Sequence, residues 1–148
     1  MEVDVVKAVP APVTPAFVRK ILRAAVRLPE VAARLPEGSV SVAVRITDDE
    51  ELRRLNQQFA GEDHATDVLS FSGDEEHLGD LAISWPAVTR QSREHRHLAE
   101  SELALLCVHG LLHLLGWDHA TAAENREMTR VTLAALAISG TRLAARRL

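Results

Sequence analysis

The sequence predicts one α+β domain, in which a small mixed sheet of four strands packs against about five helices. Short valine-rich or alternating segments predict the strands, and longer segments with apolar residues three or four apart predict the helices. The predicted order is β-α-β-α-β-β-α-α-α, without a repeat or a linker. Residues 1–148 are therefore expected to form a single domain, with 140–148 as a flexible tail.

The first strand and the first helix occupy the N-terminal quarter of the chain. Residues 2–9 are rich in valine and predict a strand. Thr14 is a candidate N-cap for a helix that extends to about Leu35. Pro29 lies inside this segment, and we expect it to interrupt the helix or to begin a second short one.

The middle of the chain predicts a strand, a helix and a β-hairpin. Apolar residues alternate with other residues over 39–47, as expected of a strand with one buried face. A helix with acidic residues in its first turn is expected over about 49–58. Two further short strands, 66–72 and 78–85, flank a polar segment and therefore predict a hairpin.

The last part of the chain predicts three helices. Pro86 can open a helix that ends near His95. The helix predicted over 99–115 is apolar almost all round, which indicates that it is buried. Thr121 is the expected cap of the last helix, with Glu124 three residues later.

Composition and charge limit the class of protein. Of the 148 residues, 47% are apolar and 26% are charged, which is typical of a soluble globular protein. The net charge of −4 argues against coating of nucleic acid by bulk charge but leaves room for a local basic groove. We see no signal peptide or membrane segment, and the one cysteine, Cys107, is expected to be a buried, inert thiol. A cytoplasmic protein without membrane or disulfide partners is therefore expected.

Three histidines form the strongest functional signal. His109, His113 and His119 lie in the stretch HGLLHLLGWDH, at spacings of four and six. The helical repeat of about 3.6 residues places the first two on one face, and Gly116 can end the helix so that the chain turns His119 toward them. Three neutral imidazoles are typical ligands of a catalytic zinc ion with an open fourth position. Nickel, copper and iron suit the same ligands.

Hydrolysis is the reaction class that such a site predicts. A bound zinc ion polarises phosphoryl or carbonyl oxygens and lowers the pKa of water from about 15.7 toward about 7. The histidine spacing equals that of metzincin peptidases, in which a glutamate directly after the first histidine is the general base. Gly110 occupies that position here, so a peptidase is the weaker interpretation.

The histidine stretch resembles the signature of the YbeY family, bacterial metal-dependent endoribonucleases that act in ribosomal RNA maturation. Other blocks resemble the family in the same order and spacing: Leu55-Asn56, TDVLSF at 66–71, LGDL at 78–81 and Met128 in the helix after the histidines. The resemblance covers about residues 40–138.

The resemblance implies a zincin-like fold with one Zn²⁺ per chain, held by His109, His113 and His119. It also implies cleavage of single-stranded RNA, maturation of the 16S ribosomal RNA 3′ end and a role in ribosome quality control. The implied partners are ribosomal RNA and the small ribosomal subunit or its assembly factors. A non-catalytic assembly factor with a structural metal remains an alternative interpretation.

Two positions differ from the family pattern. Phe59 is followed by Ala60, where the family has an arginine that can hold a phosphate, and Ala65 replaces a proline. Arg53, Arg54 or His64 are candidates to replace the lost cation.

Four polar residues are candidates to line the cleft or to accept hydrogen bonds from the metal ligands: Asp67, Ser70, Asp80 and Asp118. His95 and His97 are expected at a solvated helix end.

Overall fold

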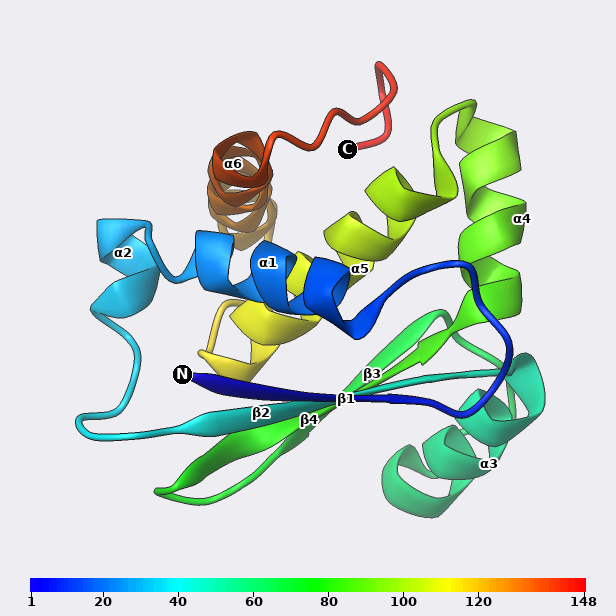
Figure 1. Cartoon of the computed structure of the whole chain (residues 1–148), viewed down its shortest axis with the longest axis horizontal. Coiled ribbons are helices and arrows are strands. Elements are labelled where there is room, and N and C mark those ends of the chain that lie inside the picture. The colour runs from blue at the N-terminus through cyan, green and yellow to red at the C-terminus, as the bar shows by residue number, and fades with distance from the viewer.

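A four-stranded mixed sheet with the strand order β1-β2-β4-β3 forms one layer of the molecule (Figure 1). The computed structural model describes residues 1–148. The three parallel strands are β1 (Glu2–Lys7), β2 (Ser41–Thr47) and β4 (His77–Ser84), and β3 (Val68–Ser72) runs antiparallel to β4. The predicted mixed sheet and the predicted hairpin are therefore confirmed.

Six helices surround this sheet, and they are α1 (Pro15–Ala25), α2 (Pro29–Ala32), α3 (Asp49–Ala60), α4 (Trp85–His95), α5 (Ala99–Leu114) and α6 (Ala122–Ser139). Helices α1, α5 and α6 lie on one side of the sheet, whereas α3 lies on the other (Figure 1). The additional helix is α2, because Pro29 begins a second short helix after α1 ends at Ala25. Leu28, which precedes this proline, is extended, as steric contact with the proline ring requires.

Side-chain caps explain where most of the helices begin. Four N-cap side chains each accept a hydrogen bond from the backbone N–H three residues later, at 3.0–3.2 Å: Thr14, Asp48, Ser84 and Thr121. Such a cap satisfies one of the free N–H groups of the first turn. Helix α5 differs, because its N-cap, Leu98, provides no side-chain hydrogen bond.

The hydrophobic core lies between the sheet and helices α1, α5 and α6. The inward residues of β2, namely Val42, Val44 and Ile46, have at most 1% of their surface exposed, which matches their predicted alternation. Full burial of one such side chain contributes about 1.5–3 kcal/mol. Cys107 on α5 is also buried, and burial raises the pKa of its thiol to about 12. The predicted burial of this thiol is thus confirmed. None of the helices is long and apolar enough to span a bilayer.

The C-terminal segment after α6 runs toward α4 (Figure 1). The backbone N–H of Ala144 donates to His97 Nδ1 at 2.9 Å, and Arg147 forms an ion pair with Glu102 at 2.6 Å. The predicted flexibility of 140–148 stays a prediction, but these contacts attach the tail to α5.

The predicted solvated position of His97 is wrong. Its side chain is 6% exposed and lies 2.7 Å from the carboxylate of Glu102, which is completely buried. A buried carboxylate is costly without partners, and here His97 and Arg147 supply them.

Candidate metal centre

Helix α5 positions the first two histidines. His109 and His113 are one turn apart and half-buried, and their Nε2 atoms are 3.0 Å from each other. Gly110 allows the helix to approach the sheet, since a Cβ atom at this position would lie 2.8 Å from Leu81 Cδ2. Ser70 on β3 donates a hydrogen bond to the Gly110 carbonyl at 3.1 Å. Helix α5 is therefore held close to the hairpin, with both imidazoles at its edge.

The turn after α5 brings in the third histidine. Gly116 adopts a φ of 93°, in the left-handed region that favours glycine, and the Trp117 N–H donates to the Leu112 carbonyl at 3.0 Å. The Trp117 ring is buried, and the guanidinium carbon of Arg34 lies 3.6 Å from its centroid. This anchored tryptophan fixes the chain two residues before His119. The predicted helix end at Gly116 is thus confirmed.

The three imidazoles converge on one point. The ring of His119 lies with its centroid 5.6 Å from that of His109 and 5.1 Å from that of His113. One ring nitrogen from each histidine lies within 4.8 Å of the other two. No other histidine, cysteine or carboxylate belongs to this group.

Burial favours the neutral forms of the two histidines on α5. Desolvation, followed by the charges of His113 and His119, lowers the pKa of His109 to about 4. Burial, and then the charge of His119, also lowers the pKa of His113. Neutral imidazoles present lone pairs to a cation, and the Nε2 atoms of His109 and His113 have no hydrogen-bond partner except each other. This donor set fits a zinc ion or a similar divalent metal.

The cluster opens into a cleft of about 450 Å³ between β3 and α5. The cleft is lined by Thr66, Asp67, Val68, Leu69, Ser70, Ser72, Leu114 and the three histidines. Four residues were predicted to line the cleft or to support the metal ligands, and of these Asp67 and Ser70 line it, whereas Asp80 and Asp118 do not.

Asp67 is the one carboxylate that lines the cleft. Both of its oxygens are engaged, because Oδ1 accepts from the Val68 N–H at 2.8 Å and Oδ2 accepts from Gln91 Nε2 at 3.2 Å. These bonds fix the start of β3 against α4. The charge of Asp67 also acts to raise the pKa of His109, against the larger effect of burial.

Asp80 and Asp118 lie outside the cleft. Asp80 is paired with Phe71 across the hairpin and lines a groove on the α3 side of the sheet, where it contacts His77 at 3.0 Å. Asp118 is exposed and accepts the His119 N–H at 2.7 Å. Asp118 thus stabilises the turn that carries the third histidine.

The family arginine is Ala60 in this chain, and none of the three candidates to replace its charge lines the cleft. Each forms an ion pair with a nearby acidic side chain: Arg53 with Asp63, Arg54 with Glu51 and His64 with Glu62. Ala60 is the exposed last residue of α3.

Arg147 is the cation that sequence reasoning missed. It lines a hollow of about 200 Å³ together with Asp67 and His109. In the sequence, Glu102 indicates such a cation. It precedes His109 by two helical turns on a helix predicted to be buried, and a buried carboxylate needs a cationic partner. Thr66 and Ser72, which also line the cleft, were missed as well.

Comparison with known proteins supports the motif-based resemblance. A family model described as Endoribonuclease YbeY matches residues 8–138. A protein named Endoribonuclease YbeY from Roseiflexus castenholzii is 40% identical, with 94% of each chain covered. One from Gloeobacter violaceus is 49% identical over 62% of this chain and 53% of its own.

The fold is also similar to a solved structure. The solution structure of TM1509 from Thermotoga maritima superposes with a TM-score of 0.61 and covers 98% of this chain and 99% of its own. Its 23% sequence identity makes this a statement about the fold alone. The family model and the full-length relative settle the classification: this chain belongs to the YbeY family.

Proposed function

We propose that this protein is a metal-dependent endoribonuclease that cleaves single-stranded RNA during maturation of the 16S ribosomal RNA 3′ end. One observation carries the proposal: three imidazoles converge in a cleft of a chain that matches the Endoribonuclease YbeY model over residues 8–138. The protein acts in the cytoplasm, on the small ribosomal subunit or with its assembly factors, and in ribosome quality control.

His109, His113 and His119 hold the metal in this proposal, and zinc is the ion that such a set most commonly binds. When bound, zinc supplies a Lewis acid at the scissile phosphate and lowers the pKa of water at that point. The chain's own groups orient the substrate. The hydroxyls of Thr66 and Ser72 line the cleft and can donate to phosphate oxygens.

Arg147 supplies positive charge at the edge of the site. Its guanidinium is paired with Glu102, and its charge helps to lower the pKa of His109 after the larger effects of burial and the other histidines. We infer that Arg147 draws the anionic strand toward the cleft, whereas burial is the main reason that the His109 imidazole is neutral. Its position differs from that of the family arginine, which is Ala60 here.

The metallopeptidase alternative lacks a free carboxylate in the expected place. A Cβ atom at Gly110 would lie 2.8 Å from Leu81 Cδ2, so a glutamate there would require the Leu81 side chain or α5 to shift. Asp67 lies in the cleft, but it precedes β3 instead of following the first histidine, and its two hydrogen bonds hold it toward Val68 and Gln91. A general base must reach the proton that it removes.

The non-catalytic alternative expects a closed, four-ligand metal site. The observed cluster has three ligands and opens into the cleft. This arrangement favours a catalytic site over a structural one.

Metal analysis and RNA cleavage test the proposal together. We expect about one zinc per chain and metal-dependent cleavage of a single-stranded ribosomal RNA fragment, both abolished by His109→Ala. His64→Ala is the matched control, because this histidine is exposed and outside the cleft. Metal-loaded protein that leaves the RNA uncut, with His109→Ala behaving identically, would contradict the proposal.

A further inference from the structure

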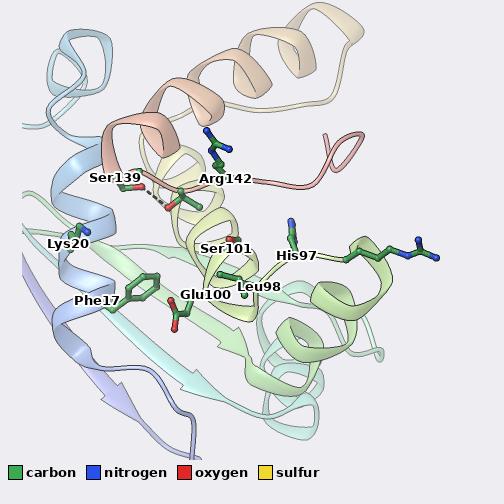
Figure 2. Close-up of a pocket in the computed structure, with 11 residues that line it drawn as sticks. Phe17, Lys20, His97, Leu98, Glu100, Ser101, Ser139 and Arg142 are labelled. Atoms are coloured by element: carbon green, nitrogen blue, oxygen red, sulfur yellow. Dashed lines mark hydrogen bonds between the residues drawn. The ribbon is translucent and has the colours of Figure 1, made fainter.

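A second hollow, of about 640 Å³, lies at the start of α5. It is an open hollow bordered by α1, the turn before α5, the first turn of α5 and the segment that follows α6 (Figure 2). We call it the α5 N-terminal pocket. It shares no lining residue with the histidine cleft.

The helix start in this pocket has free hydrogen-bond donors. Leu98 provides no side-chain cap, and the first intrahelical donor is the N–H of Glu102, which bonds to the Leu98 carbonyl at 3.1 Å. The backbone N–H groups of Ala99, Glu100 and Ser101 are therefore unpaired. Because the helix dipole adds positive partial charge at the same point, such a helix start attracts anions.

Ser101 is an independent sign of a ligand. The residue is 8% exposed and lines the pocket, and its hydroxyl forms no hydrogen bond within the protein. Most polar side-chain atoms in largely buried residues have a protein partner, whereas the Ser101 hydroxyl is open to the hollow. Figure 2 shows Ser101 among the residues that line the hollow, between Leu98 and Arg142. A ligand oxygen would complete its hydrogen bonding.

The charges at the pocket also favour an anion. Lys20, Arg96 and Arg142 line it, and none of them forms an ion pair. Glu100 is the one carboxylate in the lining, and its side chain points away from Arg142 (Figure 2). The pocket therefore has a formal charge of about +2 in a protein whose net charge is −4.

We propose that the α5 N-terminal pocket binds a backbone phosphate of the RNA whose scissile bond lies at the histidine cluster. This inference rests on the proposed nuclease function. Ser101 and His109 are on one helix, eight residues or about 12 Å apart along its axis. The C-terminal segment connects the two places, because Arg142 lines the pocket and Arg147 lines the hollow beside His109.

Phosphate binding is tested first, without RNA or catalysis. Inorganic phosphate is titrated into the full chain, and the backbone amide signals of Ala99, Glu100 and Ser101 are followed by NMR. These signals should shift in the wild-type protein and shift less in Arg142→Gln. Ser101→Ala should also weaken phosphate binding but leave the melting temperature unchanged, because its hydroxyl has no protein partner to lose.

RNA binding is tested next with variants that remove either a positive or a negative charge from the pocket, which should change the affinity in opposite directions. Lys20→Gln and Arg142→Gln should each weaken binding of a single-stranded RNA about threefold to tenfold. Each should also lower the slope of log K against log salt by about 0.7, the value for one lost phosphate contact on a single strand. Glu100→Gln should tighten binding.

Arg126→Gln is the matched control, because Arg126 is exposed on α6, forms no ion pair and lies outside the pocket. The inference is overturned if Lys20→Gln and Arg142→Gln bind RNA with the affinity and salt slope of this control. Amide shifts with phosphate but unchanged RNA binding would overturn the assignment to RNA and indicate a free phosphate instead. If RNA binding changes as expected but neither the wild-type protein nor any variant cleaves RNA, the nuclease proposal fails and the phosphate site stands.

Discussion

Histidines at the two ends of helix α5 are in opposite states: His97 lies in the turn just before the helix, and His109 and His113 lie on its last turns. At its start, His97 and Arg147 surround the buried carboxylate of Glu102, and His97 also accepts the Ala144 N–H. Near its end, the Nε2 atoms of His109 and His113 have no hydrogen-bond partner except each other. Both clusters lie on a buried helix. The first is complete within the protein, whereas the second is completed only by a cation, and this difference separates a structural cluster from a binding site.

The largest effect is expected from breaking the complete cluster. Glu102→Ala leaves His97 and Arg147 without their shared acceptor and releases the C-terminal segment. Removing one partner from a buried ion pair typically costs about 3–5 kcal/mol, which chemical denaturation would measure. The protein should still bind zinc at the histidine cluster once folded. A loss below about 1 kcal/mol would mean that the network contributes little to stability.

Metal binding at the histidine cluster should stabilise the protein by slightly less than the loss of Glu102 destabilises it. Zinc at a hundred times its dissociation constant should raise the free energy of unfolding of the wild-type protein by about 2.7 kcal/mol. His109→Ala should remove this increase while leaving the metal-free protein nearly as stable as before, since the imidazole has no other partner to lose. Denaturation with and without zinc measures both quantities. His64→Ala serves as the control, and equal stabilisation of His109→Ala would place the metal elsewhere.

Acidification should distinguish the two clusters in a third way. Burial acts to raise the pKa of Glu102, but hydrogen bonds from Arg147 and His97 outweigh it, so the folded pKa lies below its ordinary value. A depressed carboxyl pKa gives stability that is fully present above the unfolded pKa of about 4.3 and is lost as the pH falls through the folded pKa.

Glu102→Gln removes this titration. The variant should therefore lose less stability than the wild-type protein between about pH 5 and pH 3. Denaturation curves at several pH values in zinc-free buffer test this, because the metal ligands then contribute no bound cation. Parallel losses in both proteins would show that Glu102 has the same pKa in the folded and unfolded states.

Local patterns predicted the histidine cluster, whereas contacts distant in the sequence were not predictable. The helical repeat joins His109 to His113, and Gly116 ends the helix, so the cluster of three histidines follows from eleven consecutive residues. Glu102 and Arg147 are 45 residues apart, and no short-range pattern connects them. Alternation along a strand separates two faces, but only the packing of α5 and α3 reveals which face Asp80 occupies.

The smallest expected effect concerns Gly110, which allows α5 to lie close to the sheet. Gly110→Ala would place a methyl group 2.8 Å from Leu81 Cδ2, the flexible end of a side chain. Overpacking costs about 1–3 kcal/mol, and the better helix propensity of alanine returns about 1 kcal/mol. A net loss of about 1 kcal/mol is therefore expected, with weaker zinc binding because α5 moves relative to the turn that carries His119. Leu81→Val shortens the opposing side chain, so Gly110→Ala should cost less in that background. If its cost is the same in both backgrounds, contact with Leu81 is not the reason that glycine occupies the position where metzincins carry their glutamate.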